Sequence, residues 1–107
     1  MTLDLVSSAR AFGGEQRVYR HASTATGTDM EFAAFLPAEA LRGEACPTLV
    51  YLSGLTCTWE NATSKAGYQR LAAENAMIVI APDTSPRGEG VANDEAYDLG
   101  QGAGFYV

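Results

Sequence analysis

The residues of this sequence that could do chemistry follow a short apolar run, residues 48–52, whose composition is typical of a buried β-strand. Ser53, Gly54, Leu55 and Thr56 come directly after that run. A backbone that turns sharply at the end of such a strand exposes N–H groups, which acyl-transfer enzymes use to hold the oxyanion of a tetrahedral intermediate. An ordinary strand-to-helix turn has the same residue types and is commoner. The residues alone leave both interpretations open.

Cys57 lies in the same segment, and its thiol has two candidate roles. Beside a site for anions the thiol could react readily, but a small buried apolar residue is an equally good interpretation. No base is evident near it, so we do not expect it to be a nucleophile. Cys46 is the one other cysteine, so the sequence predicts neither a disulfide framework nor a zinc site. Reduced thiols indicate a cytoplasmic protein.

The titratable residues elsewhere are weaker candidates for a site. His21 is the only histidine and falls in a predicted strand, so packing is a better expectation than general-base catalysis. Asp83, Arg87 and Asp98 are interpreted as an ion-paired loop anchor rather than as catalytic groups. These residues therefore predict no catalytic acid–base pair.

Two aromatic residues and a run of glycines invite a ligand site. Trp59 and Tyr97 either line a pocket or cover the core. Gly100 and Gly102 match the first two glycines of the dinucleotide fingerprint, but Phe105 stands where its third glycine is required. No predicted strand precedes this segment, although the fingerprint follows one. We interpret these glycines as positions where the backbone packs tightly against neighbouring parts of the chain. No nucleotide cofactor is predicted.

The elements that must position these residues begin with a predicted antiparallel ribbon. Residues 3–11 and 16–22 form two candidate strands, separated by the Phe-Gly-Gly sequence at 12–14. Residues 23–29 are rich in Thr, Ser and Gly and predict a turn. Apolar residues then alternate over residues 30–36, which predicts a third strand that ends at a proline.

A strand–helix–strand unit follows the ribbon in the prediction. Residues 39–42 favour a short helical turn, and residues 48–52 form the strand already described. The best helix candidate spans residues 64–74, and Asn75 is predicted to close it in the left-handed conformation. Residues 76–81 then predict a second strand, parallel to the first. The fold class is therefore α/β.

The length and charge of the chain limit its class further. Residues 1–107 have room for one domain. Seven basic and thirteen acidic residues give a net charge of −6, which disfavours nucleic acid and anionic lipid as partners. No apolar run approaches the roughly 20 residues that span a bilayer, and the first residues do not resemble a signal peptide.

Several separated motifs, in a consistent order, closely resemble the S-formylglutathione hydrolase family, also called esterase D. The resemblance covers nearly the whole chain and is most specific from residue 49 onward. The matching motifs are LSGLTCT at 52–58, Asn61, KAG at 65–67, APDTSPRG at 81–88 and YDLGQGAGFYV at 97–107.

The resemblance implies a serine thioesterase and carboxylesterase of the α/β-hydrolase fold, acting on S-formylglutathione in formaldehyde detoxification. Its products are glutathione and formate, and its Ser-His-Asp triad needs no metal or organic cofactor. The Leu55 N–H matches the family's oxyanion donor, with Gly54 and Thr56 in the active-site vicinity. Cys57 matches a thiol close to that site. The resemblance also implies a small thioester or ester substrate, and analogy with the family suggests a homodimer.

The sequence departs from the family pattern in one large respect. It contains no Gly-x-Ser-x-Gly nucleophile elbow, and His21 does not match the triad histidine. We therefore expect residues 1–107 to be the N-terminal portion of a single α/β-hydrolase domain, inactive alone. Without the elbow strand, the strand at 48–52 would be an exposed edge that weakens the chain or promotes self-association. The alternative is a non-catalytic interaction module or a pseudogene product.

Overall fold

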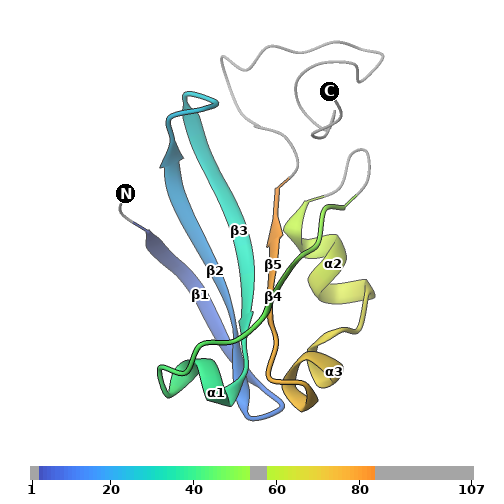
Figure 1. Cartoon of the computed structure of the whole chain (residues 1–107). Coiled ribbons are helices and arrows are strands. Elements are labelled where there is room, and N and C mark those ends of the chain that lie inside the picture. The colour runs from blue at the N-terminus through green and yellow to red at the C-terminus, as the bar shows by residue number, and fades with distance from the viewer. Residues whose placement is uncertain (1–2, 54–57, 84–107) are drawn as a thin grey trace.

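One mixed sheet forms the centre of the fold (Figure 1). The structure is a computed structural model that describes residues 3–53 and 58–83. In these two ranges the sheet has five strands in the order β1-β2-β3-β5-β4. The strands are β1 (Asp4–Ala11), β2 (Gly14–Ser23), β3 (Thr28–Leu36), β4 (Thr48–Val50) and β5 (Ile78–Pro82). The helices are α1 (Ala38–Leu41), α2 (Trp59–Lys65) and α3 (Gln69–Glu74).

Strands β1, β2 and β3 form the antiparallel ribbon that the sequence predicts. Phe12 and Gly13 make the first turn, with φ angles of 50° and 80°, and Gly27 has a φ of 68° in the second turn. Glycine reaches this left-handed region without steric cost, which explains its place in both turns. The β2–β3 register is regular from Glu15↔Leu36 to Ser23↔Thr28. All three predicted strands are confirmed.

Strand β5 joins the ribbon to the predicted parallel pair. It pairs antiparallel with β3 on one side and parallel with β4 on the other. The Tyr51 N–H extends the pairing by donating to the Ile80 carbonyl at 2.8 Å. β4 itself ends at Val50, two residues before the predicted end at residue 52. The parallel arrangement is confirmed, and the predicted bounds are slightly too long.

The single helix predicted over residues 64–74 is wrong, because two short helices occupy this part of the chain. α2 begins earlier, at Trp59, and Gly67 with a φ of 64° separates it from α3. A left-handed residue cannot continue a right-handed helix, so the glycine breaks the helix rather than merely weakening it. Asn75 is also not left-handed, with a φ of −102°, and the positive φ of 51° falls on Ala76 instead.

The core lies between the sheet and the helices α2 and α3, which cover the same face. One cluster joins Val18, Ala33 and Ala81 of the sheet to Ala62 of α2. A second cluster joins Phe35 and Val79 to Ala72 of α3. Most of these residues are small, and Phe35 is the largest fully buried side chain of the described residues.

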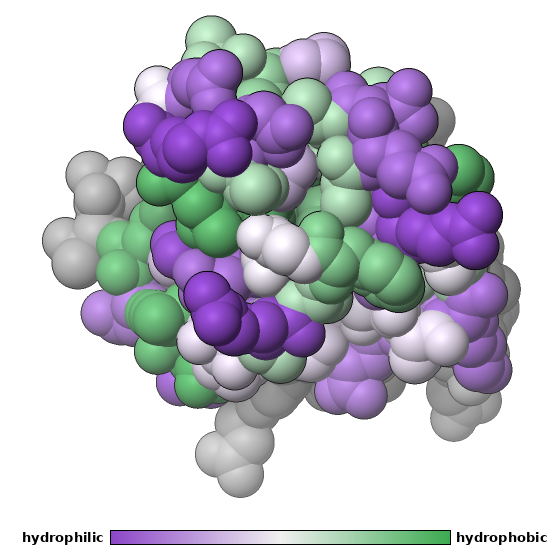
Figure 2. Space-filling model, turned by 90° about the horizontal axis from the view of Figure 1, so that it is seen from below, coloured by the Kyte–Doolittle hydropathy of each residue, from purple (hydrophilic) through white to green (hydrophobic). Residues whose placement is uncertain are grey.

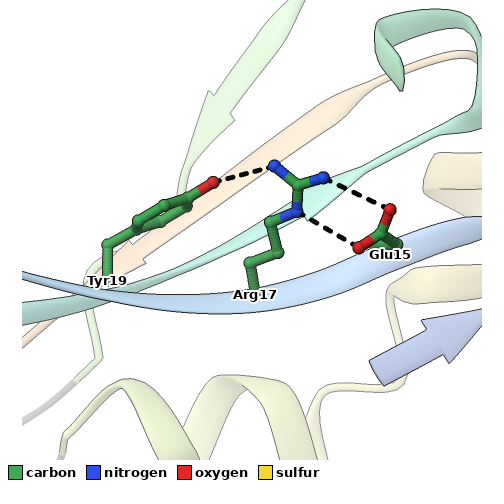
Figure 3. A network of polar contacts seen from close by, with 3 residues as sticks. All are labelled: Glu15, Arg17 and Tyr19. Atoms are coloured by element: carbon green, nitrogen blue, oxygen red, sulfur yellow. Dashed lines mark hydrogen bonds and ion pairs between the residues drawn. The ribbon is translucent and has the colours of Figure 1, made fainter. Parts of the chain in front are cut away.

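The opposite face of the sheet carries a polar row on β2 (Figure 3). Side chains alternate along a strand, so Val18 faces the helices while Glu15, Arg17 and Tyr19 point away from them. Arg17 Nη2 donates to Glu15 Oε2 at 3.2 Å, and Arg17 Nη1 donates to the Tyr19 hydroxyl at 2.9 Å. These partners raise the pKa of Arg17. The row is partly exposed, so we assign it little stabilising energy.

The end of the molecule that carries α1 and the β1–β2 turn has a mixed surface (Figure 2). Apolar patches there are separated by hydrophilic ones. Phe12 of the turn is 62% exposed and Leu41 of α1 is 40% exposed. This end therefore presents isolated apolar side chains, which are normal on a protein surface.

The free edge of β4 is different, because its apolar residues are consecutive. Leu49 is 48% exposed and Val50 is 57% exposed, and Tyr51 and Leu52 continue the exposed run. A strand of this composition is typically covered on both faces, so that interpretation of residues 48–52 is wrong for this chain. The exposed edge expected in the absence of an elbow strand is what the structure has.

Tyr68 gives the fold a predicted sensitivity to alkaline pH. Burial raises the pKa of Tyr68 to about 12, and the Tyr68 hydroxyl donates to Gln16 Oε1 at 3.3 Å. Between pH 10 and pH 12 the unfolded chain loses this proton before the folded chain does, so the free energy of unfolding falls as the pH rises. Below pH 10 this contribution is fully present.

The corresponding variant is Tyr68→Phe, which we expect to flatten the alkaline fall in the free energy of unfolding. Urea unfolding below pH 10 and near pH 12 measures this fall. Tyr51→Phe is the matched control, because Tyr51 is 39% exposed and its ring lies 6.5 Å from that of Tyr68. An equally steep fall in Tyr68→Phe and the unmodified chain would contradict the prediction.

Candidate functional site

The candidate site lies where the parallel strands β4 and β5 reach their carboxyl ends. Such ends meet at one edge of a sheet, which is where α/β proteins bind their ligands. Ser53 follows β4 and is 6% exposed, and Asp83 follows β5 directly. The start of α2 lies at the same edge (Figure 1). Three segments that are separated in the sequence therefore meet at this edge.

The first turn of α2 is capped by its own residues. The Thr58 Oγ1 accepts a hydrogen bond from the Glu60 N–H at 3.3 Å, and the Thr58 N–H donates to Asn61 Oδ1 at 2.9 Å. This reciprocal capping box fixes the direction in which the chain enters the helix. Asn61 performs the role that Glu or Gln usually has at this position.

Trp59 is held at two points by residues that are distant in the sequence. Its backbone N–H donates to Asp83 Oδ1 at 3.0 Å, and its indole Nε1–H donates to Glu31 Oε1 at 3.2 Å. The indole also packs against the cluster of Val18 and its neighbours. Trp59 therefore covers the core, and it also lines a cavity of about 320 Å³, so both interpretations of this residue are confirmed.

Glu31 connects the two anchors of Trp59. The Asp83 N–H donates to the Glu31 carbonyl at 2.9 Å, which continues the β3–β5 pairing past the end of β5. The second carboxylate oxygen of Glu31 accepts from Arg20 Nη2 at 2.7 Å. This ion pair raises the pKa of Arg20. Arg20, Glu31, Trp59 and Asp83 thus form a connected group, which we call the Trp59 anchor.

Two open cavities flank the Trp59 anchor. One, of about 320 Å³, is bounded by Arg20 and by acidic residues that include Glu31, Glu60 and Asp83. The other, of about 340 Å³, is mainly apolar, with Phe32 and Ile80 in its lining. Within residues 3–53 and 58–83, no group of three His, Cys, Asp or Glu side chains is placed to hold a metal ion.

The predicted oxyanion segment falls outside the described residues. Ser53 and Thr58, on either side of it, are described, and both lie at the carboxyl edge of the sheet. The residues of that segment are Gly54, Leu55, Thr56 and Cys57. Their assigned roles therefore remain predictions.

His21 packs rather than joining the Trp59 anchor. Its ring meets Phe32 edge-on, with the ring centroids 6.0 Å apart. Its Nδ1 is buried and has no hydrogen-bond partner. Cys46 is a free thiol whose sulfur lies 3.6 Å from the Glu44 carbonyl oxygen. Neither residue lies among those of the Trp59 anchor.

The proposed loop anchor of Asp83, Arg87 and Asp98 is described only at Asp83. In the described range Asp83 accepts from Trp59, a contact that the sequence analysis did not foresee. Arg87 and Asp98 lie outside the described residues, as do the remaining members of the C-terminal motifs. Those members are Tyr97, Gly100, Gly102 and Gly104.

Sequence reasoning missed Glu31 and the true start of α2. Two signals could have found them. Glu31 shares its face of β3 with Ala33 and Phe35, so a carboxylate stands where apolar residues face the helices. Thr58 followed three residues later by Asn61 is close to the capping-box pattern, and it places the helix start at Trp59.

Comparison with known proteins defines the class to which this fold belongs. A protein-family model described as "Putative esterase" matches residues 23–107. The chain belongs to this esterase family. A solved S-formylglutathione hydrolase from Agrobacterium tumefaciens superposes with a TM-score of 0.90 at 44% sequence identity, covering 97% of this chain and 38% of that one. The α/β-hydrolase class predicted from the sequence is confirmed, for a part of that fold.

The particular likeness is to S-formylglutathione hydrolases. The enzyme of Paracoccus denitrificans (strain Pd 1222) is 67% identical over 109 residues, which cover 100% of this chain and 39% of the relative. The enzyme of Mus musculus is 52% identical over 108 residues, again over 100% of this chain and 38% of the relative. The resemblance found in the sequence is confirmed, and the chain spans less than two fifths of the length of these relatives.

A ferulic acid esterase from Anaeromyces mucronatus shares the fold alone, with a TM-score of 0.64 at 19% identity over 84% of this chain and 39% of that one. Among the described residues no helix has the length and apolar character needed to cross a membrane.

Proposed function

We propose that this chain forms the oxyanion-binding part of a serine thioesterase and carboxylesterase that hydrolyses S-formylglutathione to glutathione and formate. The observation that carries the proposal is the short connection at the carboxyl edge of the sheet. Tyr51 is bonded to β5, Trp59 is bonded to Asp83 just after β5, and the predicted oxyanion segment joins these anchored points. The 67% identity to the Paracoccus denitrificans enzyme supports the choice of substrate.

In this proposal the Leu55 N–H donates to the substrate carbonyl oxygen as that oxygen becomes an oxyanion. Gly54, Thr56 and Cys57 form the vicinity of the donor. A serine hydroxyl attacks the formyl carbon, a histidine takes the serine proton and passes it to the departing glutathione sulfur, and water then hydrolyses the formyl-enzyme. Residues 1–107 contain no Gly-x-Ser-x-Gly motif, and the proposal assigns the triad to the rest of the hydrolase domain.

The remaining features of the proposal follow the family. The mechanism requires no metal and no organic cofactor, because the serine and histidine carry the acyl group and the proton. We place the enzyme in the cytoplasm, where its cysteines stay reduced. Its partners are a small thioester or ester substrate and a second copy of the enzyme in a homodimer.

A chimera tests the proposal directly. In the chimera, residues 1–107 of this chain replace the matching region of the Paracoccus denitrificans hydrolase. We expect the chimera to hydrolyse S-formylglutathione, followed as the loss of thioester absorbance, and the isolated chain to be inactive. A folded chimera without thioesterase activity, or activity of the isolated chain, would contradict the proposal.

A second candidate function is a non-catalytic interaction module that pairs through the free edge of β4. The observation in its favour is the consecutive exposure of Leu49, Val50, Tyr51 and Leu52. Unpaired N–H and C=O groups beside exposed apolar side chains are a template for pairing with another strand. An interaction module would work as the isolated chain, by associating through this edge. The hydrolase proposal instead requires the rest of the domain.

The variant that tests pairing through this edge is Val50→Lys. A charge on an edge strand opposes edge-to-edge pairing, so we expect the isolated chain to self-associate and Val50→Lys to shift it toward monomer. Sedimentation velocity over a range of concentrations measures the effect. Ser8→Lys places the same charge on β1, at the other edge of the sheet, and serves as the control. A monomeric, cooperatively melting unmodified chain would count against the prediction.

A further inference from the structure

The N–H groups in the first turn of α2 have partners of two kinds. The groups of Thr58 and Glu60 are satisfied within the turn, by Asn61 and Thr58. The Trp59 N–H is instead paired with Asp83, which lies 24 residues further along the chain. First-turn N–H groups lack the backbone carbonyl partner that later residues of a helix have, so they need a partner of another kind. The Asp83 carboxylate therefore ties the start of α2 to the end of β5.

The tie is held in place from both sides. The Asp83 backbone is fixed by its hydrogen bond to the Glu31 carbonyl, at 2.9 Å. The Glu31 side chain accepts from the Trp59 indole and, on its other oxygen, from Arg20 at 2.7 Å. Hydrogen bonds in which one partner is ionised are roughly twice as strong as those between neutral groups. Trp59 is thus hydrogen-bonded both to β3 and to the residue that follows β5.

We propose that Asp83 and Glu31 are positioning residues for acyl hydrolysis, acting through Trp59 to fix the point at which the chain enters α2. The proposal rests on the proposed function, because Leu55, the predicted oxyanion donor, lies four residues before Trp59. An oxyanion donor works only when it is already aimed at the developing charge. Neither carboxylate needs to touch the substrate.

The principal test is made in the chimera with Asp83→Ala, which removes the acceptor of the Trp59 N–H. We expect kcat for S-formylglutathione to fall about 10- to 100-fold, because small misplacements of catalytic groups cost this much. KM is expected to stay unchanged, since the lost interaction acts in the transition state. Rates are expressed per active site, counted by titration with an acylating inhibitor, so that loss of folded enzyme does not enter.

Two further variants separate positioning from general stability. Asp83→Asn keeps an oxygen that can accept from the Trp59 N–H, so it should retain more activity than Asp83→Ala. Glu44→Gln removes a carboxylate from an exposed ion pair with Arg42, far in sequence from the site, and should leave kcat unchanged. Hydrogen exchange at the Trp59 amide gives a readout independent of activity. We expect it to be faster in Asp83→Ala alone.

The outcomes distinguish this proposal from the proposed function. An unchanged kcat per active site in Asp83→Ala would overturn the positioning role, as would equal loss of kcat in Asp83→Asn and Asp83→Ala. An inactive parent chimera would contradict the hydrolase function instead. In that case unchanged exchange of the Trp59 amide in Asp83→Ala would overturn the tie itself, and faster exchange would uphold it.

Discussion

Replacing Leu55 with proline in the chimera is expected to lower kcat for S-formylglutathione by about 10²- to 10³-fold, the cost of removing one oxyanion donor. Proline has no backbone N–H, so the substitution deletes the proposed donor itself. The measurement is kcat and KM with S-formylglutathione, per titrated active site. Because the donor acts on charge that develops in the transition state, the loss should appear in kcat rather than in KM.

The matched control for this substitution is Leu55→Ala, which shortens the side chain and keeps the N–H. We expect Leu55→Ala to retain most of the activity, since the predicted role belongs to the backbone. The melting temperatures of both variants show whether proline has disturbed the fold. Equal activity of a stable Leu55→Pro and Leu55→Ala would exclude the Leu55 N–H as the donor and remove the chief support for the mechanism.

Replacing Phe35 with alanine should have the largest effect on stability. Phe35 is fully buried between β3 and α3, where it packs with Val79 and Ala72. Truncating a buried phenylalanine costs about 3–5 kcal/mol, from lost burial and from the cavity left behind. The partly buried side chains of Tyr68 and Met77 also pack against this cluster and would lose contacts with the ring. Urea unfolding of the chimera measures the change in the free energy of unfolding.

Phe12→Ala is the control for that measurement, because it removes the same ring from a side chain that is 62% exposed. Surface substitutions of this kind usually change the free energy of unfolding by less than about 0.5 kcal/mol. A similar loss in both variants would show that the Phe35 cluster does not carry the stability assigned to it.

Strand positions were predictable from the sequence because each strand is marked locally. Alternation over residues 30–36 and the proline that follows define β3, and turn residues separate it from β2. The helices were harder, since Gly67 could be tolerated within a helix or could end one. Its left-handed φ of 64° depends on how α2 and α3 both pack on the sheet. The residues next to Gly67 in the sequence do not predict that packing.

The candidate site was predictable in place but not in detail. The apolar strand followed by a glycine-containing segment located the carboxyl edge of the sheet, and the described ends of β4 and β5 meet there. The Trp59 anchor joins residues 20, 31, 59 and 83, and no local pattern links positions so far apart. Asp83 in particular was assigned to a pair with Arg87, because side chains near in sequence are the natural first partners to consider.

The position of β5 has a consequence for synthesis on the ribosome. β5 is the last described strand to be made, yet it lies between β3 and β4 in the sheet. The ribbon of β1 to β3 can form as soon as it emerges, whereas β4 emerges before the strand that pairs with it. Until residue 82 is free, the apolar residues of β4 have no partner within the nascent described chain. We expect this interval to be when chaperones bind the growing polypeptide, since unpaired apolar strands are prone to aggregation.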